Sequence, residues 1–235
     1  MAALFLVRHG QAGLLSEDYD RLSRVGRTQA AALGKWLRAT GQSGGLFVRG
    51  GLRRHRETAE ECLTTWREPG EPPPEVEEDA AFDEFDHLDV LGAHRADLGT
   101  PAGLAAFLRG QTQPQRAFQA VFVEAVARWT DGRHDGDYRE SWGAFKARCV
   151  EGMRRVVART PPSQNAWVFT SGGPIAVLCQ HALGLSDDRT VALTAMIHNT
   201  AVSKLLHDRS RLGLGAFNGI AHLEAMGDAS LFTYR

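Results

Sequence analysis

Short apolar runs alternate with amphipathic stretches along the chain, which predicts buried strands connected by helices. Continuous apolar runs at residues 3–7, 46–48 and 166–170 are typical of parallel strands, because such strands are buried on both faces. Two further strands are predicted over 200–207 and 212–217. The alternation favours an α/β three-layer sandwich with a mostly parallel central sheet flanked by helices.

Helical patterns fill the segments between these runs. Ser23 is suited to cap a helix that ends near Gly41, and a second helix is predicted over 54–66. The region from about 88 to 158 is helical in pattern and has no convincing strand signal. We therefore predict one domain over residues 1–235, with a helical insertion over the strand ends at about 88–158.

Composition and charge argue against several classes of function. With 43% hydrophobic residues, 23% charged residues and a net charge of −1, the chain has no general attraction for nucleic acid or an anionic membrane. No apolar segment approaches the roughly 20 residues that span a bilayer, and the short apolar start lacks the basic region of a signal peptide. Cys62, Cys149 and Cys179 fit neither a metal motif nor a disulfide framework, so we expect buried thiols and a cytoplasmic protein.

Reactive residues follow three of the predicted strands. Arg8-His9-Gly10 follows the first, residues 49–54 follow the second, and Ser171-Gly172-Gly173 follows the third. Each segment alone has an ordinary explanation: a structural histidine, a solvated pair of arginines, and a turn. In open α/β sheets, however, ligands bind outside the carboxyl ends of the strands. Their recurrence at one edge of the sheet favours a binding site there.

These residue types suit phosphoryl transfer. A neutral imidazole such as His9 can attack phosphorus and carry the phosphoryl group, provided that its other nitrogen holds the proton. Arg8 and Arg54 offer planar forks that match phosphoryl oxygens and stay charged. Gly172 permits close backbone approach, and the N–H groups after Ser171 add anion-binding dipoles. We expect no metal and no cofactor, because the arginines would neutralise the phosphoryl oxygens.

Residues 6–12, with the sequence LVRHGQA, resemble the signature of the histidine phosphatase superfamily, also called the phosphoglycerate-mutase-like family. Five later segments resemble family patterns in the same order: 21–30 (L-T-x-x-G-x-x-Q-A), 52–59 (S-x-L-x-R-A-x-x-T-A), 82–84 (L-x-E), 169–175 (H-G-G) and 217–223. The resemblance therefore covers nearly the whole chain.

The resemblance implies a role for each main residue. His9 would be the nucleophile, while Arg8 and Arg54 would clamp the phosphoryl group. Glu84 would be the general acid and base, with Asp86 as its main rival. Gln11 follows the signature and either binds substrate or holds its loop, and Ser171 and Gly172 would complete the substrate-binding residues.

The chain departs from the family pattern at three positions. Ser171 stands in place of the family's second histidine, and a lost donor of this kind typically costs ~10²–10³ in turnover. On this basis Ser171→His is expected to raise the rate. Gly50 replaces a serine, and His55 replaces an alanine. His55 either supplies the missing positive charge or, as the sequence favours, lies on the flank of a helix; His198 is a weaker compensating candidate.

Three functions follow from these residues. The first is a phosphatase that hydrolyses a small phosphomonoester through a phosphohistidine on His9. The second is a phosphoglycerate-mutase-type phosphotransferase that uses the same histidine. The third is a weak or silent phosphoester-binding protein, since Ser171 replaces the second histidine. We expect the insertion to roof the site and to set specificity, and the resemblance leaves a homodimer open.

Overall fold

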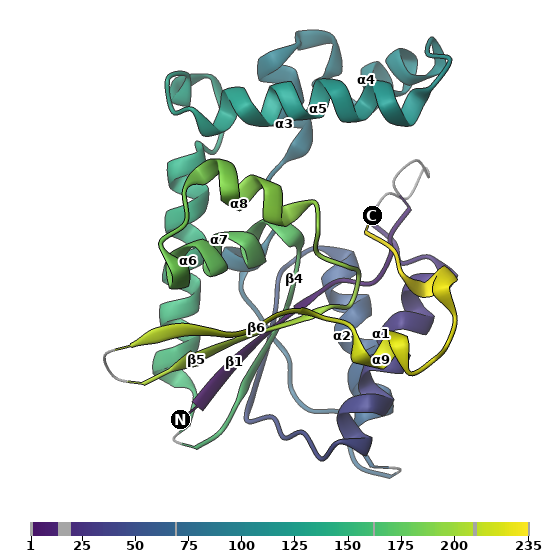
Figure 1. The fold of residues 1–235 in the computed structure, drawn as a ribbon, viewed down its shortest axis with the longest axis vertical. Coiled ribbons are helices and arrows are strands. Elements are labelled where there is room, and N and C mark those ends of the chain that lie inside the picture. Colours follow the sequence, from purple (N-terminus) through teal and green to yellow (C-terminus); the bar gives the residue numbers. More distant parts are fainter. Residues whose placement is uncertain (1, 14–19, 69, 162, 209–210, 235) are drawn as a thin grey trace. The chain divides into compact units, whose positions relative to one another are not determined.

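The computed structural model describes residues 2–13, 20–68, 70–161, 163–208 and 211–234, which form two compact units (Figure 1). One unit comprises residues 1–84 and 148–235, and the other comprises residues 85–147. The second unit is helical and overlaps most of the region that the sequence predicts as an insertion, but it begins and ends earlier than expected.

A six-stranded sheet forms the centre of the first unit in the described part of the chain. Its order is β3-β2-β4-β1-β5-β6, and the pairs among the first four strands are parallel, whereas β5 and β6 are antiparallel to their neighbours. The strands are β1 (Ala2–Arg8), β2 (Leu46–Arg49), β3 (Glu77–Glu78), β4 (Ala166–Thr170), β5 (Val202–His207) and β6 (Leu212–Gly219). The predicted α/β fold with a mostly parallel sheet is confirmed.

Helices cover the sheet and form the second unit. The first unit contains α1 (Arg24–Ala39), α2 (Arg53–Trp66), α7 (Gly172–Leu183), α8 (Asp187–Thr194), α9 (Ala221–Glu224) and most of α6 (Trp142–Arg159). The second contains α3 (His87–His94), α4 (Pro101–Arg109) and α5 (Pro114–Thr130). Ser23 caps α1 as predicted, because its hydroxyl oxygen accepts the N–H of Gly26 at 3.0 Å.

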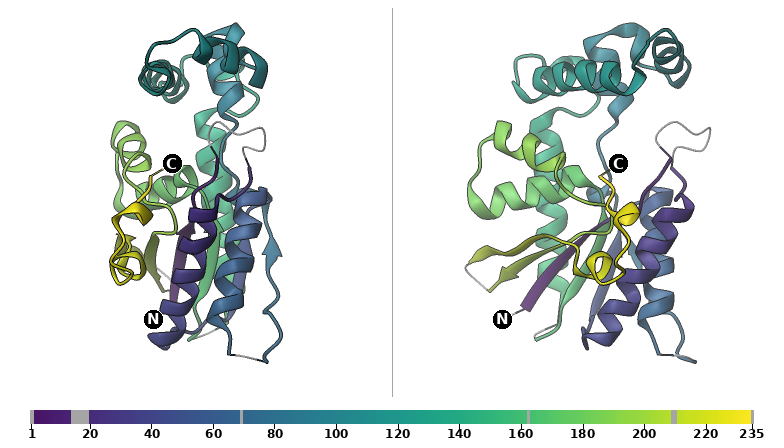
Figure 2. Two further views of the ribbon diagram at one scale, coloured as in Figure 1. Left: turned by 90° about the vertical axis from the view of Figure 1, so that its right-hand side faces the viewer. Right: turned by 45° about the vertical axis from the view of Figure 1, so that its right-hand side comes forward.

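Alternation along β1 explains why helices lie on both faces of the sheet. Phe5 and its odd-numbered neighbours pack with Trp167 of β4 against apolar side chains of α1 and α2, and the two rings stack at 4.1 Å. Leu4 and Leu6 point to the opposite face and are fully buried there. That face is covered by α7, as Figures 1 and 2 show.

The second unit has an aromatic core of its own. Phe85, Trp129, Trp142 and Phe145 contact one another with ring centroids 4.8 to 5.8 Å apart. Trp129 belongs to the apolar stripe of α5, which a helical period predicts. No helix in the described residues is both long and apolar enough to cross a membrane. The three cysteines are buried, as expected, and none forms a disulfide.

Candidate active site

Strand pairing brings the three reactive segments to one edge of the sheet. Arg8 at the end of β1 pairs with Thr170 at the end of β4, and Arg49 at the end of β2 pairs with Phe169. Since these strands are parallel, the segments that follow them leave the sheet at the same edge. The N–H of His9 continues the ladder by donating to the carbonyl of Thr170 at 2.8 Å.

A hydrogen bond holds the His9 imidazole in the tautomer whose Nε2 is unprotonated. Its Nδ1 lies 2.7 Å from the carbonyl oxygen of Gly10, which only accepts hydrogen bonds, so Nδ1 carries the proton and Nε2 keeps its lone pair. Burial lowers the pKa of His9 well below its usual value, and the charges of Arg54 and Arg8 lower it further. The ring is therefore neutral at pH 7, as a nitrogen nucleophile must be.

Hydrogen bonds fix the backbone around His9. The N–H of Gly10 donates to Thr58 Oγ1 at 3.0 Å, and the Thr58 hydroxyl donates to the carbonyl of Arg54 at 2.7 Å. The side-chain amide of Asn199 donates to the carbonyl of His9 at 3.0 Å. Position 10 requires glycine, because a Cβ there would lie 2.5 Å from the carbonyl oxygen of Gly26.

Both predicted arginines act on His9, because the charge of each lowers the pKa of its ring. Arg54 is buried, with Nη1 2.8 Å from Asp20 Oδ1 and Nη2 3.5 Å from Ser171 Oγ. The Arg8 guanidinium donates to the carbonyl of Ile197. A cluster of two guanidinium groups around one imidazole is a strong anion site, because both groups stay charged at any physiological pH.

Ser171, Gly172 and the carboxyl group of Glu84 lie at the start of α7. Gly172 is buried, and a Cβ built on it would lie 3.8 Å from Arg8 Nε. Glu84 is half-buried, and its Oε2 accepts the N–H of Gly173 at 3.1 Å. The structure therefore places Glu84 against the turn that begins with Ser171.

Asp86, the predicted rival of Glu84, has a different environment. Its Oδ1 accepts the N–H groups of Leu88 and Asp89 at 3.0 and 3.3 Å, which makes it the cap of α3. It also pairs with Arg139 at 3.1 Å. The capping bonds explain the presence of a carboxylate at position 86 without any catalytic role.

The expectation that His55 lies on a helix flank is wrong. Its side chain is fully buried, its Nε2 lies 2.7 Å from Ser171 Oγ, and its ring centroid lies 5.9 Å from that of His9. Burial lowers the pKa of His55 well below its usual value, as do the charges of Arg54 and Arg49, so the ring is neutral. The space for it exists because Gly50 has no side chain: a Cβ there would lie 2.2 Å from His55 Nδ1.

Gln11 and His198 are held by protein groups. The Gln11 side-chain oxygen accepts the Ser23 hydroxyl at 2.8 Å, which ties this loop to the start of α1. The backbone N–H of His198 donates to Asn218 Oδ1 at 2.8 Å, and its ring packs on Tyr234 at 4.1 Å. A substrate contact by Gln11 stays a prediction.

Three residues that support the site are absent from the sequence-based prediction: Asp20, Thr58 and Asn199. Asp20 accepts the backbone N–H of Arg53 at 2.6 Å, at the start of α2, as well as the Arg54 side chain. Thr58 lies in the segment at 52–59 that resembles the family pattern, so the sequence motif could have identified it. Asp20 and Asn199 are brought to the site only by tertiary packing, and no local motif marks them.

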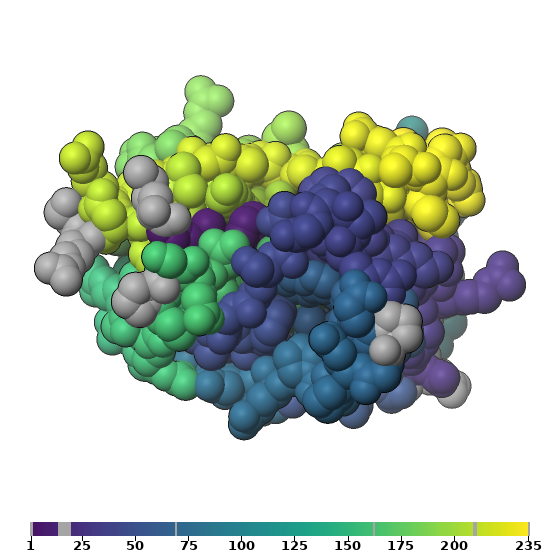
Figure 3. All heavy atoms as spheres, turned by 90° about the horizontal axis from the view of Figure 1, so that it is seen from below, coloured from purple at the N-terminus to yellow at the C-terminus, as the bar shows by residue number. Residues whose placement is uncertain are grey.

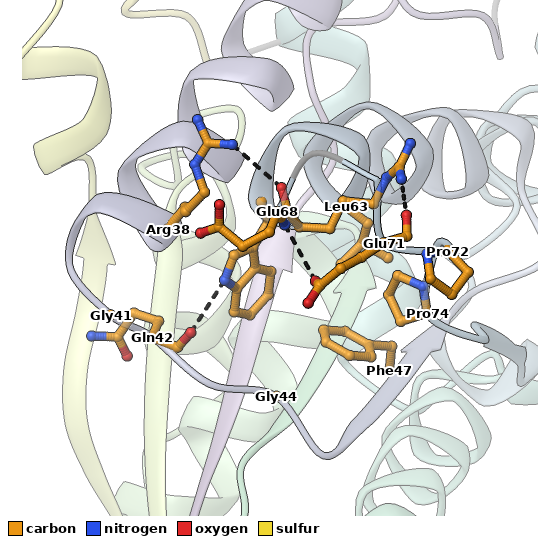
Figure 4. A pocket seen from close by; sticks show the side chains of 12 residues that line it. Arg38, Gly41, Gln42, Gly44, Phe47, Leu63, Glu68, Glu71, Pro72 and Pro74 are labelled. Carbon is orange, nitrogen blue, oxygen red and sulfur yellow. Dashed lines mark hydrogen bonds between the residues drawn. The ribbon is translucent and has the colours of Figure 1, made fainter.

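A pocket of about 370 Å³ lies at the other end of the sheet (Figure 4). Gln42 and Gly44, which precede β2, line it together with Glu71 and Pro72, which follow α2. Figure 3 looks onto this end, where the parallel strands begin. The pocket is therefore separate from His9, which follows the carboxyl end of a strand.

Comparison of the chain with models of protein families shows which family it belongs to. The model of the histidine phosphatase superfamily (branch 1) matches residues 4–219. The chain belongs to this superfamily. The resemblance inferred from the sequence motifs is thus confirmed at the level of the family. Among curated protein sequences, none matches the chain.

Several solved structures share the fold. A mycobacterial glucosyl-3-phosphoglycerate phosphatase is 22% identical, with 93% of this chain and 99% of that chain covered and a TM-score of 0.61. A phosphoglycerate mutase from Bacillus anthracis is 16% identical, with 97% of each chain covered and a TM-score of 0.62. Bacillus stearothermophilus YhfR is 19% identical, with 95% and 100% covered and a TM-score of 0.67. At these identities the likeness concerns the fold.

Proposed function

We propose that this protein is a phosphatase that hydrolyses a small phosphomonoester through a phosphohistidine at Nε2 of His9. The observation that carries the proposal is the bond from His9 Nδ1–H to the Gly10 carbonyl, which leaves Nε2 bare beside two arginines. Family membership adds support, because the relatives with this fold include a phosphatase and a mutase.

In the first step, the lone pair of His9 Nε2 attacks phosphorus and the bond to the leaving oxygen breaks. Arg8 and Arg54 neutralise the charge on the phosphoryl oxygens, which is the main requirement of this transfer. Glu84 donates a proton to the departing oxygen, so that an alcohol leaves rather than an alkoxide. The His9 ring keeps its Nδ1 proton throughout, and the Gly10 carbonyl stabilises the positive charge that the ring acquires.

In the second step, water attacks phosphorus and the bond to Nε2 breaks. Glu84, now a carboxylate, takes a proton from that water and returns to its starting form. Phosphate leaves, and His9 is again neutral. Every proton and bond in the two steps is accounted for by the substrate, water and these side chains.

The test compares the wild type with a His9→Ala variant on a panel of small phosphomonoesters, with and without a bisphosphate primer. A phosphatase releases inorganic phosphate without a primer, and His9→Ala abolishes that release. Isomerisation without phosphate release, dependent on a bisphosphate, identifies a mutase. Equal release by both proteins contradicts the proposed nucleophile. Tight binding of phosphoesters with no release identifies a silent binder.

The same proposal includes the small phosphorylated substrate and the cytoplasmic location. Two guanidinium groups at one imidazole favour a phosphate ester over a neutral substrate. The cysteines are buried and none is paired in a disulfide, which is consistent with a reducing compartment.

A further inference from the structure

A buried polar pair lies beside the proposed phosphoryl site. His55 and Ser171 are fully buried, and their Nε2 and Oγ atoms are 2.7 Å apart. Ser171 Oγ is also 3.5 Å from Arg54 Nη2, so the serine lies between the imidazole and a phosphoryl-binding guanidinium. Burying such groups is costly unless they are hydrogen-bonded. The contact satisfies His55 Nε2 and Ser171 Oγ, whereas His55 Nδ1 is buried with no hydrogen-bond partner in the described part of the chain.

The other side of the imidazole faces a carboxylate. Asp83 Oδ1 accepts the N–H of Gly51 at 2.6 Å and lies 3.7 Å from His55 Nδ1. A nearby carboxylate favours a proton on the nitrogen that faces it, which leaves Nε2 as the acceptor of the Ser171 hydroxyl. The lone pairs of Ser171 Oγ are then available to Arg54 Nη2. The four side chains therefore lie in succession from Asp83 to Arg54. Hydrogen bonds join His55 to Ser171 and Ser171 to Arg54. Asp83 faces His55 Nδ1 across 3.7 Å without a hydrogen bond.

Gly50 completes the arrangement. A Cβ at this position would lie 2.2 Å from His55 Nδ1 and 2.7 Å from Asp83 Oδ1, so any larger residue would displace the ring or the carboxylate. Glycine at 50 and histidine at 55, the two departures from the family segment, are thus explained by a single contact. Ser171, the third departure, is the partner of the same imidazole.

We propose that His55, acting through Ser171, is a positioning residue that holds Arg54 for the phosphoryl group, and that Gly50 is present to admit its ring. The inference rests on the proposed function. The pair does not replace the charge of a second histidine. It restricts instead the rotation of a guanidinium that must meet the phosphoryl oxygens, and misplacement of such a group by about 1 Å can cost roughly 10²-fold in rate.

The test uses a matched pair of variants at position 55. Glutamine carries a polar atom where His55 has Nε2, whereas leucine has similar bulk and no polar atom. We expect His55→Leu to lower kcat/KM and the affinity for orthovanadate by roughly 10- to 100-fold, and His55→Gln to stay within a few-fold of the wild type. Equal effects of the two variants would show that only packing matters and would overturn the proposal.

Two double-variant comparisons test the route of the effect. Ser171→Ala is expected to change little in the His55→Leu background, because both changes break the same link; additive losses would contradict this route. Gly50→Ser is expected to impair the wild type and to be better tolerated in His55→Ala, where the ring is absent and only the Asp83 carboxylate has to move. Equal impairment in both backgrounds would reject the role of Gly50, and this comparison holds even if His55→Leu does not fold.

Orthovanadate binding separates this inference from the proposed function. If His9→Ala leaves phosphate release intact, the nucleophile assignment fails while the binding comparison still reports on Arg54. If the wild type binds vanadate without turnover, the effect of His55→Leu on that affinity still tests the positioning role. Unchanged vanadate affinity in His55→Leu rejects the inference whatever the turnover.

Discussion

His222 offers a prediction that can be worked out quantitatively. Its side chain is buried, and its Nε2 lies 2.9 Å from Thr200 Oγ1. The Thr200 hydroxyl donates to the carbonyl of Asn199, so Oγ1 accepts the proton of His222 Nε2. The N–H of Thr200 in turn lies 3.1 and 3.3 Å from the carbonyls of Arg8 and His9. His222 therefore supports the backbone that carries the proposed nucleophile.

Burial lowers the pKa of His222 to about 4, whereas the unfolded chain titrates this histidine near its ordinary value of 6.5. Between these values the unfolded state binds a proton that the folded state does not, so stability falls as the pH is lowered. Above pH 6.5 both states are neutral and the effect vanishes. Across the window from 6.5 to 4 the loss amounts to about 3 kcal/mol.

The perturbation is His222→Gln, which keeps a polar donor near Nε2 and cannot titrate. Urea denaturation of the wild type and the variant at pH 7.5 and pH 4.5 gives the free energy of unfolding of each. We expect the difference between the two proteins to shift by about 2.5 kcal/mol in favour of the variant at the lower pH. His9 and His55 titrate in both proteins, so their contributions cancel.

The exposed residue His181 provides the matched control. His181→Gln is expected to follow the pH dependence of the wild type. If His222→Gln also follows the wild type, the buried imidazole does not titrate as argued, and the account of this support is wrong.

Three further predictions concern the site. Thr58→Val leaves a buried N–H of the His9 loop without its acceptor and should lower the free energy of unfolding by about 1–3 kcal/mol, measured by urea denaturation. Glu84→Gln should lower kcat by roughly 10²–10⁴ on alkyl phosphates. The loss should be smaller on p-nitrophenyl phosphate, because its leaving group needs little protonation. Asp86→Asn should keep wild-type kinetics, because asparagine still caps α3. Ser171→His should lower kcat/KM because the His55 ring fills the space, and His55→Ala in the same chain should restore part of it; a gain from the single change would contradict this.

Most of the fold follows from the apolar pattern. Residues 166–170 are predicted as a strand and form β4, because the whole run is buried in the sheet. Residues 77–78 form β3, which is too short to show a pattern, and α8 at Asp187–Thr194 carries only a weakly amphipathic one. The division at residue 85 depends on which residues contact one another in the folded chain, and periodicity does not reveal those contacts.

The candidate site was only partly predictable. His9, Arg8 and Arg54 follow from motifs at strand ends, because parallel strands bring those ends together. The position of His55 did not follow, since it depends on the missing side chain of Gly50, which precedes α2 and is not part of the helical pattern. For the same reason, the contact between His55 and Ser171 leads us to predict that Ser171→His lowers the rate, whereas the sequence alone predicts a gain.

The most direct test of the central claim is to trap the enzyme during turnover and to locate the phosphoryl group. Rapid acid-free quenching with a phosphorus-labelled substrate, followed by peptide mapping and nitrogen-resolved NMR, identifies the modified atom. The account predicts a phosphoryl group on Nε2 of His9, absent from His9→Ala. Phosphate release with no phosphoprotein, or a phosphoryl group on Nδ1 or on another residue, would contradict it.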